Sequence, residues 1–399
     1  MTGTEHDIFD VAVIGGGATG FAAALTAVAT GCRTVLFAPP ATFPPGRTAA
    51  LLQGSVDILS GLDVWPALMD QAAPLKAIRI VDATKRLIRA PEVIFHAAEI
   101  GLPAFGFNVP NGELVAALRG HAESRAELTI VEAPVQSVGH DEDSVTVSAE
   151  DEAYPARLVV AADGARSIAR EAAGISVRSW THRQSALVAT FAIERPHGGV
   201  STEFHIETGP FTLVPLPGDR VSLVWMDRPQ QAERTIALDG PALSRLVEER
   251  AFSIHGGMQL DSAPALFPLR AALADRFAAR RTILVGEAAH RFPPIGAQGL
   301  NLGFRDVAAL GRVLSRHRGD PGSPAAVDSY HAARQSDVRG RALAVDLLNR
   351  SVLTDFLPVQ AARGIGLALA SSVPVLRRAL MRRGLAEGMR GMKTRVRVL

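Results

Sequence analysis

The chain has 399 residues, 47% of them hydrophobic, and a formal net charge of +2 at pH 7. This length and apolar content suffice for two domains or one large composite domain, and the near-neutral charge gives no indication of nucleic-acid binding. The single cysteine, Cys32, excludes an internal disulfide framework and a dithiol redox pair, and is typical of a protein from a reducing compartment.

The N-terminal stretch MTGTEHDIFD lacks a basic region, so we predict no signal peptide. No apolar run reaches the roughly 18 residues that a membrane-spanning helix needs. No repeat with a period of roughly 20–50 residues is visible. We also predict no metal site.

The first motif follows a predicted buried strand, Ile8 to Ile14. Gly15, Gly17 and Gly20 have the G-x-G-x-x-G spacing of a dinucleotide-binding turn and precede an alanine-rich helical stretch. The first glycine makes the turn, the second admits a pyrophosphate, and the third lets helix and strand pack closely. The motif therefore predicts dinucleotide binding.

The second predicted strand, Arg33 to Phe37, lacks the acidic residue that this type of site places at its end to hold the ribose hydroxyls. Ala38 stands there, and the nearest later acid is Asp57, in a different predicted element. A hydrogen bond to a charged group contributes about 1.5–3 kcal/mol. We therefore expect the adenosine end of a dinucleotide to bind less tightly.

Two more candidates lie on either side of the first predicted β-rich region. Arg47 precedes a predicted helix over Ala50 through Leu62. Asn111 suits the N-cap of a predicted helix over Glu113 to Ala122. Either residue is explained without a ligand, Arg47 as a solvated side chain and Asn111 as a cap alone.

Residues Leu128 to Val160 read as a hairpin and a returning strand, with the turn at Asp141 to Asp143. Asp163 and Gly164 follow that strand. An Asp-Gly pair is a common turn, and here it directly follows a buried strand.

From Arg183 to Met226 the sequence alternates apolar and polar residues, which predicts half-buried strands. Phe211 lies in one of these strands, where an aromatic residue is readily part of the core.

The most informative segment, RTILVGEAAHRFPPIGAQGLNLGFRDVAAL, begins at Arg281. It reads as a strand from Thr282 to Val285, an acidic turn, a proline loop that forbids helix, and a helix from Leu300 onward. The bare first turn of that helix offers N–H donors and a positive dipole end to an anion or an electron-rich ring edge.

The stretch GEAAHRFPPIGAQGLNLGFRD resembles the second flavin-binding motif of the FAD-dependent aromatic hydroxylases, the p-hydroxybenzoate hydroxylase group. RTAALLQGSVDILSGLDVW and the Asp-Gly motif are similar to the same family. GPFTLVPLPG and the region beyond Tyr330 resemble its ubiquinone-biosynthesis branch, of the 2-polyprenyl-6-methoxyphenol hydroxylase type. The resemblance covers nearly the whole chain.

This resemblance implies an α/β fold with a Rossmann-like FAD-binding domain, an inserted mixed β-sheet substrate domain and a C-terminal helical region. Cofactor segments 1–75, 108–178 and 277–345 would enclose substrate segments 76–107 and 179–276, followed by 346–399. The implied cofactor contacts are Gly15, Gly17, Ala18, Thr19, Gly20, Arg47, Asn111, Val135, Asp163, Gly164, Gly286, Glu287, Pro293, Gly296, Gly299, Leu300 and Asn301. The implied substrate-facing residues are Phe211, Phe292 and Pro293.

The implied activity is hydroxylation of a polyprenylated phenol on the route to ubiquinone, with NAD(P)H as reductant, O2 as co-substrate and a flavin hydroperoxide as the hydroxylating species. No residue is marked as an obligatory acid or base. His290 is the nearest titratable candidate, and a structural role for it is the stronger reading.

Two alternatives remain. A flavin-dependent halogenase shares the implied fold but needs paired tryptophans, and Trp65, Trp180 and Trp225 lie far apart. The other is a degenerate member that scaffolds a quinone-biosynthesis complex with weak or no FAD binding. Two residues motivate this alternative: Ala38, which stands in place of the acidic ribose ligand, and Glu287, where most of the family has aspartate.

The C-terminal segment from Ala361 to Leu399 carries nine basic side chains and one acidic one, Glu387. Its apolar stretch, Gly364 to Leu376, is too short to span a bilayer and contains Pro374. An apolar face beside a basic cluster suits the membrane interface. We therefore expect a cytoplasmic protein held peripherally on the inner face of the cell membrane; a solvated basic tail is the alternative.

Overall fold

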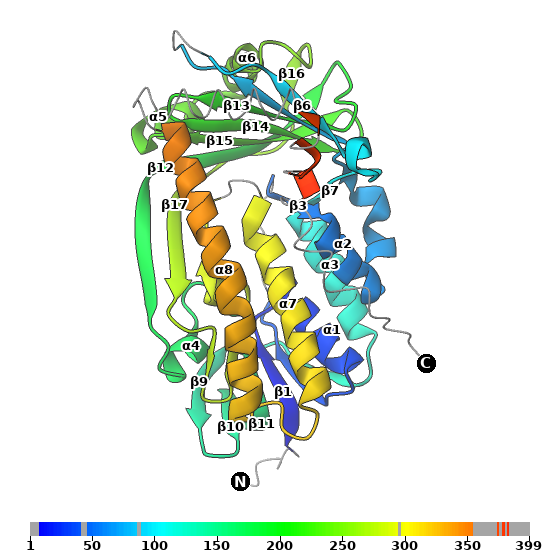
Figure 1. Ribbon diagram of the computed structural model, residues 1–399, viewed down its shortest axis with the longest axis vertical. Coiled ribbons are helices and arrows are strands. Elements are labelled where there is room, and N and C mark those ends of the chain that lie inside the picture. Colours follow the sequence, from blue (N-terminus) through cyan, green and yellow to red (C-terminus); the bar gives the residue numbers. More distant parts are fainter. Residues whose placement is uncertain are drawn as a thin grey trace.

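The computed structural model describes residues 8–40, 46–85, 89–293 and 297–353, and short pieces between 373 and 382. Figure 1 shows two halves along the long axis: a lower half of parallel strands and long helices, and an upper half built on a second sheet. The helices and sheets match the mixed α/β fold expected from the sequence, with a Rossmann-like half and a separate β-sheet half.

The lower sheet is built around parallel strands in the order β19-β11-β1-β2-β8. Sequences such as FDVAVI and TVLF are apolar almost throughout because both faces of these strands are buried. The antiparallel strands β9, β10 and β18 extend this sheet. Its members are β1 (Phe9–Ile14), β2 (Thr34–Phe37), β8 (Leu128–Val131), β9 (Val135–His140), β10 (Val145–Ala149), β11 (Glu152–Ala161), β18 (Ala278–Ala279) and β19 (Thr282–Leu284).

Helices of the lower half pack against this sheet and against one another, and α7 and α8 run side by side in Figure 1. Tyr330 anchors α8, because its buried hydroxyl donates to the carbonyl of Leu284 at 2.8 Å. The helices are α1 (Ala18–Ala29), α2 (Gln53–Gly61), α3 (Asn111–Glu123), α4 (Ile168–Ala172), α7 (Gln298–Arg316) and α8 (Pro324–Leu353), with short 3-10 turns η1 (Trp65–Gln71), η2 (Ala97–Ile100) and η3 (Gly286–Ala288).

The upper sheet has the strand order β20-β17-β12-β15-β14-β13-β5-β6, and β16 pairs with β12. Helices α5 (Pro229–Ile236) and α6 (Gly240–Arg250) pack against this sheet. Its strands are β5 (Ala77–Asp82), β6 (Val93–His96), β12 (Val177–Ile193), β13 (Val200–Ile206), β14 (Gly209–Leu216), β15 (Arg220–Asp227), β16 (Met258–Leu260), β17 (Ala265–Ala274) and β20 (His290–Arg291).

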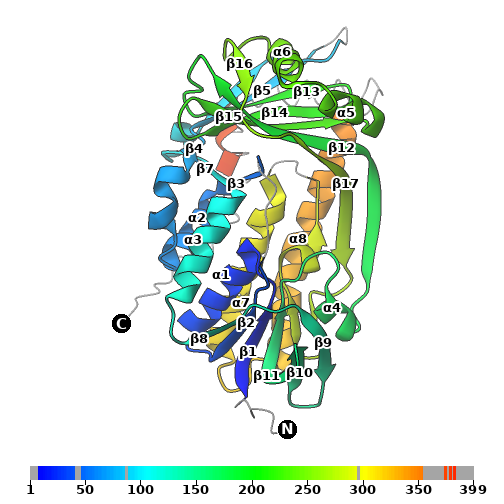
Figure 2. The same ribbon diagram turned by 180° about the vertical axis from the view of Figure 1, so that it is seen from behind.

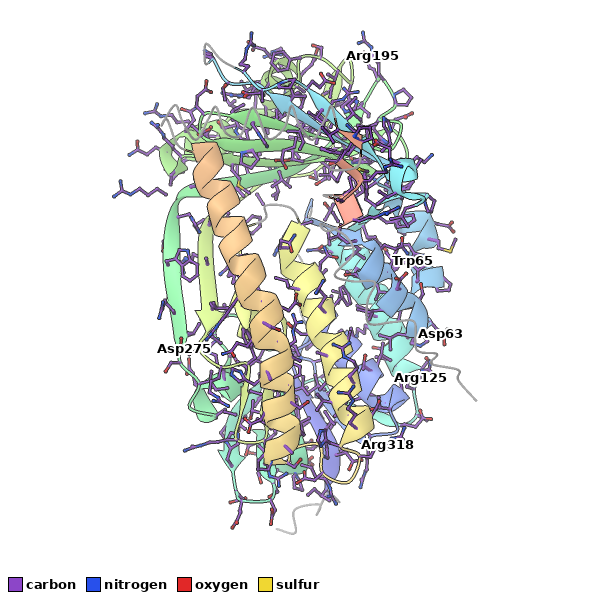
Figure 3. All side chains as sticks on the ribbon, in the orientation of Figure 1. Asp63, Trp65, Arg125, Arg195, Asp275 and Arg318 are labelled. Atoms are coloured by element: carbon purple, nitrogen blue, oxygen red, sulfur yellow. The ribbon has the colours of Figure 1, made fainter. Side chains whose placement is uncertain are left out.

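Two features connect the halves. The long strands β12 and β17 form a ribbon that runs from the lower half into the upper sheet, as seen from behind in Figure 2. A small sheet lies between the halves, with the order β3 (Thr48–Leu52), β7 (Gly106–Pro110) and β4 (Ala73–Pro74). Figure 3 marks the two ends of the molecule: Arg195 on the upper half and Arg318 beyond α7 on the lower half.

The structure corrects three predicted boundaries. Residues 48–52 form a strand, so the helix expected from Ala50 begins only at Gln53. The expected N-cap Asn111 is the first residue of α3, and Pro110 occupies the cap position. The helix expected from Leu300 begins at Gln298. In the first case, pairing of β3 with β7 outweighs the local helical pattern.

A short C-terminal piece docks on the upper half near β6 and β7 (Figure 1). The guanidinium of Arg377 forms two hydrogen bonds with the carboxylate of Glu99, at 2.6 and 2.7 Å, and lies 4.8 Å from the ring centroid of Phe95. Met381 is buried against Ala97 and Phe105. Apart from residues 373, 374, 377–379, 381 and 382, the predicted basic segment lies outside the described residues.

Candidate active site

The glycine-rich turn lies between β1 and α1, at the carboxyl end of the parallel sheet. A Cβ atom on Gly15 would lie 2.2 Å from the carbonyl oxygen of Ala162, and one on Gly20 only 1.9 Å from that of Gly15. A Cβ on Gly17, the N-cap of α1, would meet no atom within 4 Å. The first and third glycines therefore permit close packing, while the second borders open space that a pyrophosphate can occupy.

Ala18 and Thr19 follow in the first turn of α1. Ala18 packs against the lower core. Thr19 lies where α1 meets the segment after β19, since a Cβ added to Gly286 or Gly303 would lie 3.2 or 2.7 Å from its hydroxyl oxygen. The side chain of Thr19 thus joins the glycine-rich turn to η3 and α7.

The Asp-Gly motif lies directly beside this turn. The added Cβ of Gly15 would also lie 3.0 Å from the backbone nitrogen of Asp163. Asp163 Oδ2 accepts a hydrogen bond from the amide of Ala169 at 3.3 Å, and burial raises the pKa of this carboxyl group. Its buried Oδ1 has no hydrogen-bond partner among the described residues. Gly164, with φ of 79°, also borders open space.

Asn111 and Arg47 meet through their backbones beside the paired strands β3 and β7. The amide of Asn111 donates to the carbonyl of Arg47 at 3.0 Å. Because Pro110 is the N-cap, the Asn111 side chain does not cap α3, and its buried Oδ1 has no partner in the described part of the chain. The exposed Arg47 places its guanidinium 5.1 Å from the ring centroid of Phe267 in β17. Val135, at the start of β9, is buried in the lower core.

After β19, the chain turns through η3 toward the second sheet. The Gly286 amide, at φ of 61°, donates to Asp306 Oδ2 at 2.9 Å. The side chain of Glu287 is 54% exposed and lies 3.9 Å from the guanidinium of Arg291. Phe292 stacks on His290 with ring centroids 5.9 Å apart, and Pro293 is buried. The predicted contact at Gly296 lies outside the described residues.

Helix α7 begins after Ala297, which has a positive φ of 53°, and no side chain caps it within the described structure. Open space borders Gly299, and Leu300 packs against the lower core. Such an uncapped start offers backbone N–H groups and the positive end of the helix dipole. The uncapped helix start expected from the sequence is therefore present, and anion binding there stays a prediction.

The side chain of Asn301 holds α7 against β3 and α2. Its Oδ1 accepts from the Leu52 amide at 2.8 Å and the Ser55 hydroxyl at 2.7 Å, and its Nδ2 donates to the carbonyls of Ala50 and Ala297 at 2.8 and 2.6 Å. These four bonds commit the side chain to protein contacts. Asn301 can therefore reach a cofactor only through its backbone.

His290 belongs to a buried network of charged residues. Its Nε2 lies 2.7 Å from Asp306 Oδ2, and Arg334 Nε donates to Asp306 Oδ1 at 2.6 Å. Arg334 also donates to Asp337 at 2.6 Å, and Arg305 binds the same carboxylate through two hydrogen bonds. His290, Asp306 and Arg334 at the centre of this network are almost completely buried, which supports the structural reading of His290.

Charge compensation makes burial of Asp306 tolerable. Burial alone would raise the pKa of Asp306, but the charges of His290 and Arg334 together lower it below its usual value. The sequence analysis did not single out Asp306 or Arg334. The available signal was an aspartate among the apolar residues Phe304 and Val307 of a predicted helix, since a buried carboxylate needs a partner.

The predicted substrate wall Phe211 faces away from the lower half. It is fully buried and packs edge-on against Phe204 and Trp225, in a cluster that includes residues of α6. This corrects the expectation that Phe211 faces the substrate. The opposite face of the sheet points toward β3, because the hydroxyls of Ser222 and Thr48 lie 3.1 Å apart.

The residues present fit a dinucleotide. Open space borders Gly17, and the buried oxygens Asp163 Oδ1 and Asn111 Oδ1 have no partner among the described residues. Buried polar atoms without a partner are costly, so a ligand is their natural complement. The fold and site thus define an α/β protein that binds a dinucleotide at the edge of its parallel sheet, beneath a second sheet.

Comparison with known proteins gives the family. A family model described as FAD binding domain matches residues 9–342. The chain is 32% identical to ubiquinone hydroxylase UbiL of Rhodospirillum rubrum, over 96% of this chain and 90% of that protein. It is 31% identical to 3-demethoxyubiquinol 3-hydroxylase of Escherichia coli, over 92% of this chain and 96% of that protein. The protein therefore belongs to the FAD binding domain family, in the ubiquinone-biosynthesis branch of the FAD-dependent aromatic hydroxylases.

Solved structures confirm the fold. The structure of p-nitrophenol 4-monooxygenase PnpA from Pseudomonas putida is similar with a TM-score of 0.78 at 18% identity, covering 96% of this chain and 98% of that chain. HpxO of Klebsiella pneumoniae, solved with FAD and uric acid, gives a TM-score of 0.77 at 18% identity, covering 95% and 97%. The protein is a FAD-dependent monooxygenase, which confirms the predicted enzyme class and cofactor. The individual contact residues remain predictions.

Proposed function

We propose that the protein hydroxylates a polyprenylated phenol in ubiquinone biosynthesis. In this reaction one atom of O2 replaces a ring hydrogen as a hydroxyl group, and the other leaves as water. NAD(P)H supplies the two electrons and, with a solvent proton, balances the reaction. The observation that carries the proposal is near-full-length similarity to two ubiquinone-pathway hydroxylases, together with a site that fits FAD.

Different residues of the chain would have different roles in this reaction. Bound FAD supplies the redox chemistry with O2. Backbone N–H groups of the glycine-rich turn would hold its pyrophosphate, with the Asp163-Gly164 turn lying over it. Asn111 and Arg47 would contact its phosphate side, and Glu287 would accept from its ribityl chain. The start of α7 and the loop that includes Pro293 would lie against the ring. Since Asp306 holds His290, we assign no proton transfer to that histidine.

The upper sheet would cover the reaction and exclude water. Its face toward β3 includes Ser222 and, by strand register, Val214 and Val224. The two valines offer apolar contacts to a phenol with a long hydrocarbon tail. Phe292 and Pro293 would approach the substrate from the other side.

The cofactor and substrate are tested separately. Purified protein should show the absorption spectrum of an oxidised flavin, or acquire it with added FAD. Oxygen consumption with NAD(P)H should then rise with a polyprenyl phenol, and mass spectrometry should detect a product heavier by one oxygen atom. Cells lacking the gene and any other such hydroxylase should accumulate an under-hydroxylated quinone precursor.

The possible failures have different meanings. A protein that takes up no FAD would favour the scaffold of a quinone-biosynthesis complex. A flavoprotein that leaves every polyprenyl phenol unchanged, in cells with normal quinone levels, would contradict the proposed substrate but leave FAD binding intact.

We also propose that the basic C-terminal segment holds the enzyme on an anionic membrane surface, on the inner face of the cell membrane. No helix in the described portion is both long and apolar enough to cross a bilayer. Basic residues near an anionic leaflet contribute about 1 kcal/mol each. Docking would bring the enzyme to a prenylated substrate.

Liposome flotation tests the membrane proposal. Full-length protein should float with anionic vesicles at low salt and be released at high salt, because salt screens surface charge. Arg377 already pairs with Glu99, so Arg390 and Lys393 are better candidates for substitution. If a folded protein truncated after Gln360 floats equally well, the segment is not the anchor.

A further inference from the structure

The end of β2 lacks the carboxylate that usually holds the adenosine ribose in this type of site. Ala38 is almost completely buried there, and a Cβ added to Gly16 would lie 3.2 Å from both its Cα and its Cβ. The alanine thus packs against the glycine-rich turn and has no polar side-chain atom to offer. A ribose at this edge needs an acceptor from a neighbouring element.

The neighbouring strand β8 brings such an acceptor to the same edge. It runs parallel to β2, with Phe37 opposite Val131, and the Ala38 amide donates to the Val131 carbonyl at 2.9 Å. Glu132 is the next residue of the chain. Because paired strands lie about 4.8 Å apart, its backbone lies about one strand spacing from Ala38.

An arginine holds Glu132 in place. Arg119 in α3 donates through Nη2 to Glu132 Oε1 and through Nε to Glu123 Oε1, the latter at 2.7 Å. The side chain of Glu132 is 57% exposed, so its carboxylate is accessible to a ligand. Within the described residues every recorded contact of Glu132 uses Oε1, and a carboxylate has lone pairs for further hydrogen bonds.

We propose that Glu132, oriented by Arg119, accepts the ribose hydroxyls of the adenosine half of FAD and so replaces the missing acid at position 38. The carboxylate keeps its usual role but comes from the next parallel strand. Arg119 is a positioning residue, because it acts through Glu132. The inference rests on FAD binding by this family.

Glu123 provides a matched control. It accepts from the same arginine and is similarly exposed, with a side-chain exposed fraction of 53%. It lies at the end of α3, whereas Glu132 lies at the strand edge. If Arg119 and the two glutamates formed only surface ion pairs, loss of either carboxylate would have the same effect on FAD affinity.

The experiment measures FAD affinity of the apo-protein by flavin fluorescence. We expect Glu132→Gln to weaken FAD binding about 10-fold or more and Glu123→Gln to change it less than about 2-fold. Neither variant should alter the affinity for FMN, which lacks the adenosine half. Equal effects of the two variants on FAD, or an equal loss of FMN affinity in Glu132→Gln, would overturn the proposal.

A change in the ligand gives a second, independent measurement. FAD lacking the adenosine 2′-hydroxyl should bind several-fold more weakly than FAD to the wild type, and this difference should shrink in Glu132→Gln. Placing the carboxylate at its usual position, as Ala38→Glu, should recover most of the affinity of Glu132→Gln and add little to the wild type. A wild type that binds no FAD would contradict the cofactor assignment itself, and an undiminished analogue effect in Glu132→Gln would contradict the role of Glu132.

Discussion

The two halves of this enzyme differ in the kind of side chain that their cores bury. In the lower half, charge enters the core: the side chains of Asp306 and Arg334 are 1% and 4% exposed and bind each other. In the upper half, the cluster between the sheet and α6 is aliphatic and aromatic, with Phe211 and Trp225 at its centre. The first core depends on directional pairing and the second on packed volume.

This difference explains why the cofactor half is the easier one to recognise. A dinucleotide site needs glycines where a side chain would block it and polar atoms that the fold leaves unsatisfied, as at Gly17 and Asp163. In the proposed function, the upper half would cover a hydrophobic substrate with ordinary strand residues. The sequence of the upper half therefore indicates little of its function beyond the alternation of apolar and polar residues in its strands.

The largest expected effect is on the cofactor half. Gly17→Val should weaken FAD binding about 1,000-fold, close to 4 kcal/mol, because the added side chain fills the space that the pyrophosphate needs. The fold should persist, since a Cβ at Gly17 meets no protein atom within 4 Å. Flavin content and thermal unfolding measure the two effects. Gly120→Val, at another uncrowded glycine, should retain FAD; wild-type flavin content in Gly17→Val would contradict the assigned motif.

The next test removes a charge from the lower core. Asp306→Ala should lower the free energy of unfolding by about 3–5 kcal/mol, because it leaves Arg334 buried with one partner fewer. Urea unfolding measures the loss. Asp328→Asn, in the exposed pair with Arg276, should change stability by about 1 kcal/mol or less. Similar values for the two variants would remove the contrast between the buried network and a surface pair.

A substitution in the upper core tests the corrected role of Phe211. Phe211→Ala should cost about 3 kcal/mol or more in unfolding free energy, because it opens a cavity beside Phe204 and Trp225. Its KM for the phenol should stay near that of the wild type, measured well below the unfolding temperature. Val214→Ala, on the opposite face, is the comparison that should alter KM. Wild-type stability with a raised KM in Phe211→Ala would restore Phe211 as a substrate wall.

The smallest expected effect concerns the docked C-terminal piece. Arg377 holds the pKa of Glu99 below its ordinary value of 4.5. Because the folded-state pKa is lowered, the pair stabilises the docked piece above pH 4.5, and this contribution is lost as the pH falls through the lowered value. Glu99→Gln should therefore reduce hydrogen-exchange protection of the residues around Arg377 by about 1 kcal/mol or less at pH 7.

The difference between Glu99→Gln and the wild type should shrink as the pH falls below 4.5 and through the lowered pKa of Glu99. Glu92→Gln is the control, since Glu92 is 53% exposed and pairs with Arg79 elsewhere on the upper sheet. A pH-independent difference would mean that Glu99 holds the piece without its charge.

Sequence patterns identified most of the lower half because its constraints are local. The glycine spacing at Gly15, the turn at Asp141 and the strand before Gly286 were all predicted and are all present. The helix expected from Ala50 failed where strand pairing decided the conformation. Asn111 failed as a cap because Pro110 precedes it with the backbone geometry of that position.

The sequence by itself therefore determined the enzyme class and the cofactor, through its resemblance to the FAD-dependent aromatic hydroxylases. It also predicted the edge of the sheet where the cofactor binds, because glycines and turns act over a few residues. Only the tertiary structure decided which way Phe211 faces, since the sheet face toward α6 is set by partners far along the chain. It also decided that Asp306 meets His290 and Arg334, and that Glu132 lies beside Ala38. Such pairings come from parallel strands and packed helices, whose contacts join residues that are distant in sequence.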